Sequence, residues 1–237
     1  MPRTKPSACV PTNAAWRPAV CPPVPLKPYY DRDGITLYHA DCRHVLPYLE
    51  VIDLLLTDPP YGIKADRCGG RMQAKKGKGT WRDYGDTNWD QSRPPASIFA
   101  LMLERTREQI IWGGNYFSDY LSPSMRWLVW DKGQRNFSLA DCEFAWTNQR
   151  KAARIFSFSR SKALQDGKVH PTQKPLALME WCLGFAKGVT SVLDPFAGSG
   201  TTLLACKRAG IRAIGIELNE TYCELAVERL EKTSGPT

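Results

Sequence analysis

The order of apolar and polar residues predicts alternating strands and helices from about residue 35 onward. Residues 35–40 form one apolar run, and residues 51–57 form a second, continuous enough for a strand covered on both faces of a parallel sheet. Further strands are predicted at 109–112, 126–130, 142–146, 154–158, 190–193 and 211–216. Helices are predicted at 43–50, from Pro94 to about Arg107, at 201–209 and at 220–232.

The last third of the chain has the clearest pattern. A strand at 190–193 leads into a glycine-containing turn, and the helix that follows ends at Gly210. The next strand ends at Glu217. This succession of a strand, a glycine turn, a helix, a second strand and an acid is typical of the nucleotide-binding half of a doubly wound α/β sheet.

Two regions lack such a pattern. Residues 1–30 hold eight of the 18 prolines, and we interpret them as a Pro-rich N-terminal arm that precedes one domain, residues 31–237. Residues 62–93 are rich in Gly, Lys and Arg without a clear period. A loop of this length within a compact domain is usually functional or mobile.

Positive charge is concentrated in two segments of the chain. The net charge is +8, whereas residues 64–82 carry seven basic residues against one acid, and residues 148–168 carry six against one. The remainder is therefore net negative. This pattern is expected of a surface that contacts phosphates, and two solvated loops are the alternative.

The composition predicts a cytoplasmic protein without a membrane segment or a metal. No apolar run approaches the roughly 18 residues that span a bilayer, and the N-terminus lacks the apolar stretch of a signal peptide. The eight cysteines form no Cys-x-x-Cys pair, and the three histidines complete no zinc spacing. Cys206 and Cys223 lie in apolar segments and are predicted to be buried thiols.

The glycine-containing turn is a candidate ligand site. Its residues are Asp194, Pro195, Phe196, Ala197, Gly198, Ser199, Gly200, Thr201 and Thr202. The glycines let a ligand approach the backbone closely at a helix start. Glu217 follows Gly200 at about the spacing at which an acid receives ribose hydroxyls. A dinucleotide site and a plain helix cap are alternatives, whereas a P-loop is excluded because no Lys follows the glycines.

A second candidate site, Asp58-Pro59-Pro60-Tyr61, directly follows the apolar strand at 51–57. It therefore lies at the carboxyl end of the sheet, where ligands bind. The prolines make the turn stiff and carry no N–H. A carboxylate and a carbonyl can accept both hydrogens of an NH2 group, and Tyr61 offers a flat face to a planar base. An ordinary turn after a strand is the alternative.

These features suit methyl transfer to an exocyclic base amine. The lone pair of such an amine is delocalised into the ring, and accepting its hydrogens out of the ring plane localises the pair on nitrogen. The amine can then attack a sulfonium methyl directly at near-attack distance. Because a stacked duplex hides the amine, the base must be flipped out.

The two motifs resemble those of the DNA amino-methyltransferases, the adenine-N6 and cytosine-N4 enzymes that use S-adenosylmethionine. The resemblance covers roughly residues 35–232, and the catalytic motif at 57–61 precedes the cofactor motif at 194–202, the order of the beta group. Residues 170–175 resemble the segment beside the methionine end of the cofactor. The resemblance implies a Rossmann-like methyltransferase fold, with a mostly parallel doubly wound sheet, an antiparallel strand and helices on both faces.

The resemblance also implies residue roles. Catalysis falls to Asp58, Pro59, Pro60 and Tyr61. Asp41, with the Cys42 backbone alongside, would bind the cofactor adenine, and Glu217 would hold the ribose. The implied cofactor-binding residues are Asp41, Cys42, Thr57, Asp58, Thr172, Lys174, Asp194, Phe196, Ala197, Gly198, Ser199, Gly200, Thr201, Thr202, Glu217, Leu218 and Asn219. Asp41 capping the next helix is the alternative, and we interpret His170 as a structural histidine.

Many beta-group enzymes carry a sizeable target-recognition segment, and the strands after Gly113 leave little room for one here. We therefore predict that DNA recognition falls to the basic loop 62–93 and the basic stretch 148–168. The candidate DNA-binding residues are Lys64, Arg67, Arg71, Lys75, Lys76, Arg82, Arg150, Lys151 and Arg160.

The sequence thus predicts a site-specific DNA adenine-N6 methyltransferase, associated with the nucleoid of a bacterial or phage-infected cell. Asp rather than Ser at the head of the catalytic motif favours adenine, and a cytosine-N4 enzyme is the second candidate. RNA or protein-glutamine methylation is the third, because those relatives more often carry Asn where this chain has Asp58. A non-catalytic DNA-binding module and an NAD-dependent oxidoreductase each explain the motifs less completely. A homodimer and a restriction partner are left open.

Overall fold

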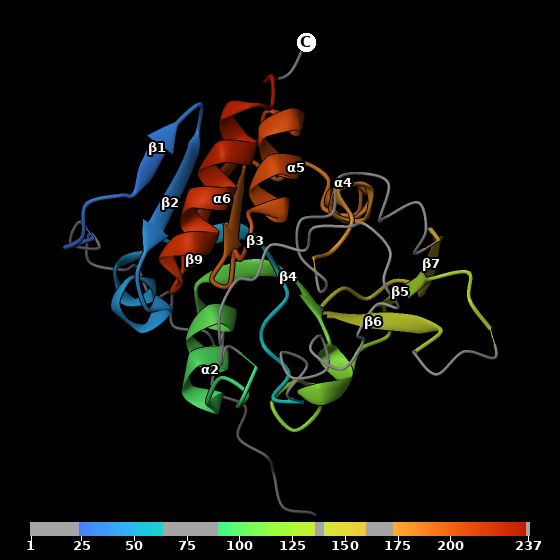
Figure 1. The fold of residues 1–237 in the computed structure, drawn as a ribbon. Helices are drawn as coiled ribbons and strands as arrows, with labels where there is room; N and C mark the ends of the chain where they lie inside the picture. Colours follow the sequence, from blue (N-terminus) through green and yellow to red (C-terminus); the bar gives the residue numbers. More distant parts are fainter. Residues whose placement is uncertain (1–23, 64–89, 136–139, 160–172, 236–237) are drawn as a thin grey trace, which may run out of the picture.

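The computed structural model describes residues 24–63, 90–135, 140–159 and 173–235 (Figure 1). Within them the strands form one nine-stranded sheet in the order β1-β2-β9-β8-β3-β4-β6-β5-β7. The strands are β1 (Tyr30–Arg32), β2 (Ile35–His39), β3 (Ile52–Thr57), β4 (Thr106–Trp112), β5 (Trp127–Asp131), β6 (Cys142–Thr147), β7 (Arg154–Ser157), β8 (Ser191–Asp194) and β9 (Arg212–Glu217). The helices are α2 (Ala96–Glu104), α4 (Leu176–Leu183), α5 (Thr201–Ala209) and α6 (Glu220–Glu231), with short 3-10 helices η1 (Cys42–His44), η2 (Leu46–Tyr48) and η3 (Gly114–Tyr116).

Most neighbouring strands of the sheet run parallel, as predicted. In the described part of the chain, β1 is antiparallel to β2, and β6 is antiparallel to both β4 and β5. The sheet therefore contains a second antiparallel strand in addition to the one expected. Figure 1 shows β1 and β2 at one end of the sheet and β7 at the other.

Helices cover both faces of the sheet because its central strands are apolar on both. Leu54 and Leu56 of β3 pack in one cluster with residues of α4, α5 and α6. Leu55, between them, packs in a second cluster with residues of α2 and the 3-10 helices. Successive side chains of a strand point to opposite faces, so a continuous apolar run requires both layers.

The prediction of one helix at 43–50 is wrong, because the 3-10 helices η1 and η2 occupy this segment instead. Pro47 lies in the first turn of η2 and has no N–H to donate to an α-helix that began at residue 43. The helix predicted to reach about Arg107 ends at Glu104. Thr106 already belongs to β4, and its hydroxyl donates to the Met102 carbonyl of α2 at 2.7 Å.

The sequence predicts neither β1 nor α4. β1 begins at Tyr30, the last residue assigned to the N-terminal arm, and Tyr29 N already donates to Leu37 O at 2.8 Å. Residues 1–23 of the predicted arm lie outside the described residues. α4 begins after Pro175 and packs against α5.

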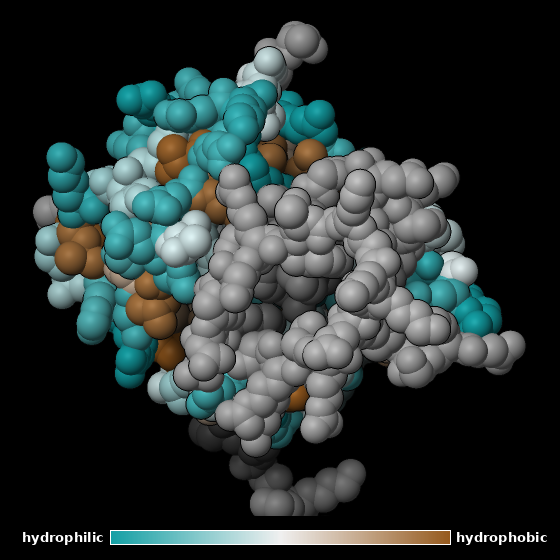
Figure 2. All heavy atoms as spheres, viewed as in Figure 1, coloured by the Kyte–Doolittle hydropathy of each residue, from teal (hydrophilic) through white to brown (hydrophobic). Residues whose placement is uncertain are grey.

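The described surface is mostly hydrophilic on the face that Figure 2 shows, with small, separate hydrophobic patches. Within the described ranges no helix is long and apolar enough to cross a membrane, and no group of His, Cys, Asp and Glu could hold a metal ion. Cys206 and Cys223 are buried free thiols, as predicted.

Candidate active site

Four parallel strands end at one edge of the sheet, and each ends in or beside an acid. Asp58 follows β3, Asp41 follows β2 closely, and Asp194 and Glu217 end β8 and β9. The carboxyl ends of parallel strands share an edge, and α/β proteins bind ligands there. These acids line one cavity of about 710 Å³, which is within the usual range for small-molecule sites.

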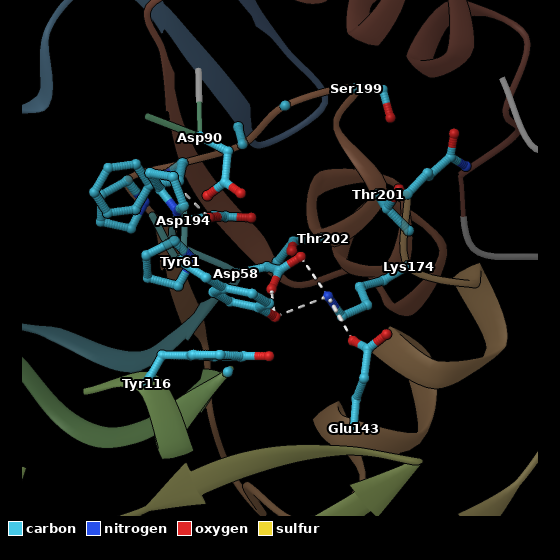
Figure 3. A pocket seen from close by; sticks show the side chains of 18 of the residues that line it. Asp58, Tyr61, Asp90, Tyr116, Glu143, Lys174, Asp194, Ser199, Thr201 and Thr202 are labelled. Carbon is cyan, nitrogen blue, oxygen red and sulfur yellow. Dashed lines mark hydrogen bonds and ion pairs between the residues drawn. The ribbon is translucent and has the colours of Figure 1, made fainter. Parts of the chain in front are cut away.

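Within this cavity the Asp58 carboxylate accepts hydrogen bonds from two side chains (Figure 3). Lys174 Nζ donates to its Oδ2 at 2.5 Å, and the Tyr61 hydroxyl donates to its Oδ1. Lys174 Nζ also lies 3.2 Å from the Tyr61 hydroxyl oxygen. Each oxygen of an ionised carboxylate accepts about two hydrogen bonds, so Asp58 retains capacity for a substrate amine.

Glu143, a second acid, lies on the other side of Lys174, and no sequence motif indicates it. Its Oε2 is 3.1 Å from Lys174 Nζ, and its Oε1 is 2.6 Å from Lys132 Nζ. Glu143 belongs to β6, whose first residues reach the catalytic edge because β6 is antiparallel to β4. In the sequence it is one acid within a predicted strand, and nothing there indicates which strand it pairs with.

Burial and neighbouring charge determine the ionisation of this cluster. Burial raises the pKa of Asp58 above its ordinary value, although the Lys174 ammonium opposes the rise. Burial alone would lower the pKa of Lys174, but the carboxylates of Asp58 and Glu143 raise it to about 12. Burial also works against ionised Glu143, yet Lys174 and Lys132 lower its pKa to about 2. Lys174 is therefore an ammonium and Glu143 a carboxylate at neutral pH.

Tyr61 is held against three neighbours. Its ring stacks on Tyr116 with centroids 4.7 Å apart and meets Phe117 edge-on at 6.1 Å. Gly113 lies against the ring so closely that a Cβ there would be 2.0 Å from Tyr61 Cε1. Burial raises the pKa of Tyr61 well above its ordinary value, so its hydroxyl remains a donor. Tyr116 thus covers one face of the Tyr61 ring.

Asp90 lies beside the end of the loop at residues 58–61, and no sequence motif indicates it. Its side chain is buried and lines the cavity, and its Oδ1 accepts a hydrogen bond from Gly62 N at 2.7 Å. Gly62 directly follows Tyr61, so this hydrogen bond anchors the end of the loop.

The glycine turn leaves open space for a ligand beside a fixed carboxylate. Gly198 has a φ of +51°, and no heavy atom lies within 4 Å of the position of its absent Cβ. Gly198 N donates to Glu217 Oε2 at 2.7 Å, and Asn219 N donates to Oε1 at 2.8 Å. Burial raises the pKa of Glu217. The carboxylate retains acceptor capacity for two hydroxyl groups, which a ribose presents.

Asp194 is hydrogen-bonded to the last residue of β3. Its Oδ1 accepts hydrogen bonds from the Thr57 hydroxyl at 2.7 Å and from Phe196 N at 3.2 Å. Burial raises the pKa of Asp194 to about 6. Thr57 itself is not among the lining residues of the cavity, so it acts on the site through Asp194.

Carboxylates outnumber ammonium groups in this cavity. The described lining contains six acids and two lysines, namely Asp41, Asp58, Asp90, Glu143, Asp194 and Glu217 with Lys132 and Lys174. A cleft lined by one sign of charge raises the local concentration of the opposite sign. The cavity therefore favours a positively charged ligand over a dinucleotide with its phosphates.

Most of the predicted site residues come together here. The cavity is lined by Asp41, Cys42, Asp58, Pro59, Pro60, Tyr61, Lys174, Asp194, Phe196, Ala197, Gly198, Ser199, Thr201, Thr202, Glu217 and Leu218. Asn219 is placed differently, because its side chain caps α6 by accepting a hydrogen bond from Tyr222 N at 3.3 Å. Gly200 also lies outside the lining and packs against Ala226 of α6.

Asp41 makes two interactions with Arg43. Its Oδ1 accepts from Arg43 N at 2.9 Å at the start of η1, and its Oδ2 pairs with the Arg43 guanidinium at 2.6 Å. The alternative that Asp41 caps a helix is confirmed, although the helix is a 3-10 turn. These bonds lower the pKa of Asp41. Because Asp41 also lines the cavity, a contact with a cofactor adenine stays a prediction.

Arg150 and Lys151 lie at the other end of the sheet from Asp58. Thr147, at the end of β6, pairs with Ile110, and the Asn148 side chain donates to Arg107 O near the start of β4. At roughly 3.3 Å per residue, the length of β4 separates this end from the catalytic edge by about 20 Å. The remaining predicted contacts lie outside the described residues, namely Lys64, Arg67, Arg71, Lys75, Lys76, Arg82, Arg160, His170 and Thr172.

Comparison with known proteins identifies the family of this chain. The family model for N6 and N4 DNA methylases matches residues 129–228. The type II methyltransferase M.HpaI of Haemophilus parainfluenzae is 49% identical over 223 residues, and the match covers 76% of this chain and 68% of that protein. The chain belongs to the N6-adenine and N4-cytosine DNA methyltransferase family.

Other DNA methyltransferases extend the match along the chain. M2.DpnII of Streptococcus pneumoniae is 28% identical over 258 residues, covering 86% of this chain and 92% of that protein. The solved M1.HpyAVI–SAM complex is 25% identical with a TM-score of 0.55, covering 83% of this chain and 100% of that one. The cytosine-N4-specific PvuII methyltransferase has the same fold, with a TM-score of 0.58, 16% identity and coverage of 86% and 88%.

S-adenosylmethionine is the cofactor of this family, and the cavity fits it. The turn at Gly198 leaves open space, and the Glu217 carboxylate can accept ribose hydroxyls. The excess of carboxylates suits the positive charge that a sulfonium carries.

Proposed function

We propose that this chain transfers a methyl group from S-adenosylmethionine to the exocyclic N6 amine of adenine in DNA. The observation that carries the proposal is the position of Asp58, which shares one cavity with the glycine turn and with Glu217. Asp rather than Ser heads the catalytic motif, which favours adenine. The Escherichia coli protein named DNA adenine methyltransferase YhdJ is 37% identical over 91 residues, 38% of this chain and 31% of that protein.

The residues of the turn and of two strand ends would hold the cofactor. Glu217, fixed by two backbone N–H groups, would accept the ribose hydroxyls, and the open backbone at Gly198 would lie along the molecule. The buried Asp194 carboxylate would complement its positive charge. When bound, S-adenosylmethionine supplies a methyl group on a positively charged sulfur, which the amine nitrogen attacks directly.

Asp58 would activate the amine and accept the proton that it releases. A carboxylate acts as a proton acceptor more effectively when its pKa is raised, and burial raises the pKa of Asp58. Lys174 opposes that rise and keeps Asp58 ionised in its partly buried position. The carboxylate accepts a hydrogen bond from the amine, which favours a lone pair localised on nitrogen.

Tyr61 would receive the base after it leaves the duplex. Its ring is fixed by Tyr116, Phe117 and Gly113 and lines the cavity beside Asp58, so it would offer the base a preformed stacking partner. Stacking on an aromatic ring offsets part of the cost of unstacking the base from its neighbours.

The test is to incubate the protein with duplex DNA and labelled S-adenosylmethionine, digest the DNA and identify the methylated nucleoside. We expect label on N6 of adenine. Asp58→Ala should lower transfer by at least about a thousandfold, because both the hydrogen-bond acceptor and the proton acceptor are removed. Cofactor binding, measured by calorimetry, should largely survive, since the ribose and turn contacts are untouched.

Asp58→Asn is the matched control, because it keeps the shape and one acceptor oxygen but cannot take the proton. We expect it to be nearly as inactive as Asp58→Ala. Label on the cytosine amine would replace adenine with cytosine-N4 as the target. Near-normal turnover by the alanine variant would refute the mechanism.

A further inference from the structure

Four charged side chains of alternating sign form a continuous series that begins at the catalytic carboxylate. Asp58 Oδ2 is 2.5 Å from Lys174 Nζ, which is 3.1 Å from Glu143 Oε2. Glu143 Oε1 is in turn 2.6 Å from Lys132 Nζ. Figure 3 shows Lys174 placed between the two carboxylates, with Glu143 reaching up from β6 on the side away from Asp58.

The proposed methyl transfer requires only the first two of these four charges. A single ammonium beside Asp58 would keep it ionised, and neither Glu143 nor Lys132 contacts Asp58. Partly burying two further charges costs desolvation free energy, which close pairing must offset. A structural ion pair is the simplest explanation, but it does not account for an acid that shares the ammonium paired with Asp58.

Sharing the ammonium changes the basicity of Asp58. An ammonium that paired with Asp58 alone would lower the pKa of that carboxyl and make it a poorer proton acceptor. The negative charge of Glu143 acts in the opposite direction and raises the pKa of Asp58. Lys132 balances Glu143, so the four charges together sum to zero when all are ionised.

We propose that Glu143 is a positioning residue for methyl transfer, which holds the Lys174 ammonium between two carboxylates so that Asp58 stays ionised yet accepts a proton from the base amine. The inference rests on the proposed function of Asp58. It assigns Glu143 an effect on the chemical step and none on the binding of cofactor or DNA.

Other titratable groups also face this cluster and remain unchanged in the variants below. They are Tyr61, whose hydroxyl bonds to Asp58, and Asp194, which lies close enough for the Asp58 charge to raise its pKa. The aromatic rings of Tyr61 and Trp112 lie 5.6 and 5.9 Å from Lys174 Nζ and carry no charge.

The experiment measures the single-turnover rate of methyl transfer against pH, with saturating DNA and S-adenosylmethionine, for wild type and Glu143→Gln. Saturation makes the acid limb of the profile report the ionisation of the bound complex. Gln keeps the shape of Glu143 but removes its charge, so Lys174 pairs with Asp58 alone. We expect the acid limb to move to lower pH by about one unit. The plateau rate should fall roughly three- to tenfold, as expected for a less basic acceptor.

Two control variants separate charge from structure. Glu143→Asp keeps the charge, so its acid limb should stay at the wild-type pH even where a shorter side chain lowers the plateau. Glu180→Gln makes the same change in an exposed ion pair with Arg208 at 2.9 Å, away from the cavity, and should leave the profile unchanged. Cofactor affinity, measured by calorimetry, should be the same for wild type and Glu143→Gln.

Three outcomes would overturn the inference. A wild-type profile for Glu143→Gln would show that the charge has no effect on Asp58. A uniform loss of rate with a lower melting temperature and no shift of the acid limb would show a structural role. A shift of the acid limb to higher pH would mean that Glu143 acts mainly by keeping the Lys174 ammonium beside Asp58. In each case an inactive Asp58→Ala would leave the proposed function standing, whereas an active Asp58→Ala would remove its basis.

Discussion

Gly113 determines where the Tyr61 ring lies, because the two residues touch without room for a side chain. A Cβ at position 113 would overlap the ring, and the φ of +69° is itself unfavourable for any residue with a Cβ. Gly113 comes directly after β4, so the end of this strand fixes the position of the Tyr61 ring.

We therefore expect Gly113→Ala to displace Tyr61 and to lower methyl transfer by roughly a hundredfold, the effect of misplacing a reacting group by about 1 Å. Gly188→Ala is the matched control, since Gly188 has a φ of +77° and no heavy atom within 4 Å of its absent Cβ. Both variants should lose about 1–2 kcal/mol of unfolding free energy from backbone strain. Equal rates for the two variants would contradict the placement of Tyr61. Methyl-transfer assays and urea unfolding measure the two effects.

Individual site residues could be predicted where they belong to a local motif. Asp58, Asp194 and Glu217 each end a predicted strand, and the parallel order of such strands places them together. Glu143 and Lys132 could not be predicted in this way. They reach the site through the pairing of β6 with β4 and β5, and a pairing partner is a long-range choice that no local pattern records.

At the scale of elements, the strongly periodic segments match the prediction and the short ones do not. The helix at 201–209 was predicted with its observed bounds, and the central strands agree within a few residues. The segment at 43–50 contains enough apolar residues for a helix, yet Pro47 divides it. β1 is three residues long and gains its stability from pairing with β2, which its own sequence does not show.

Asp53 links three neighbouring strands at the edge of the sheet opposite the cavity. It belongs to β3 and bonds to residues of β4 and of the segment that leads into β8, so its substitution tests how these strands pack. Its Oδ1 pairs with Arg107 at 2.6 Å, and its Oδ2 accepts hydrogen bonds from Thr190 N and Oγ1 at 3.0 and 2.8 Å. The hydrogen bonds from Thr190 contribute most to lowering the pKa of Asp53 to about 2. Because the folded-state pKa lies below the ordinary value of 3.8, this stabilisation is present above pH 4 and is lost as pH falls toward 2.

Asp53→Asn should therefore lower the unfolding free energy by about 1–2 kcal/mol at pH 7. The difference from wild type should shrink as the pH falls below 4, and urea unfolding at several pH values measures it. Glu180→Gln, in its exposed pair with Arg208, should change stability by less than about 1 kcal/mol at any of these pH values. A constant difference between Asp53→Asn and wild type down to pH 3 would contradict the ionic origin of the effect.

At the scale of the whole molecule, Arg150 and Lys151 lie in the described part of one basic segment that the sequence assigned to DNA. Arg150 and Lys151 lie about a strand length from Asp58, whereas the loop 62–93 begins directly after Tyr61. A base held at Asp58 must come from DNA that passes near this edge of the sheet. The predicted DNA contact of Arg150 and Lys151 would therefore lie about a strand length from the base, and it stays a prediction.

We expect Lys75→Ala with Lys76→Ala to weaken DNA binding and to reduce the slope of log affinity against log salt by up to about 2, near one per phosphate contact. The same change at Arg150 and Lys151 removes equal charge and should leave that slope nearly unchanged. Fluorescence anisotropy at several salt concentrations gives both slopes. If the Arg150 and Lys151 pair had the larger effect, the DNA path would run over the other end of the sheet. Deleting residues 68–80 should also change sequence preference.

The excess of carboxylates in the cavity has a consequence after the chemical step. Methyl transfer turns the sulfonium of the donor into a neutral thioether, so the spent molecule lacks the charge that the acidic lining favours. Fresh donor should therefore displace spent product readily, and product inhibition should be weak at equal concentrations. Raising the salt concentration would narrow this difference, because it screens the charges on which the preference depends. If these acids favour the donor in this way, they would also help to release the product between one turnover and the next.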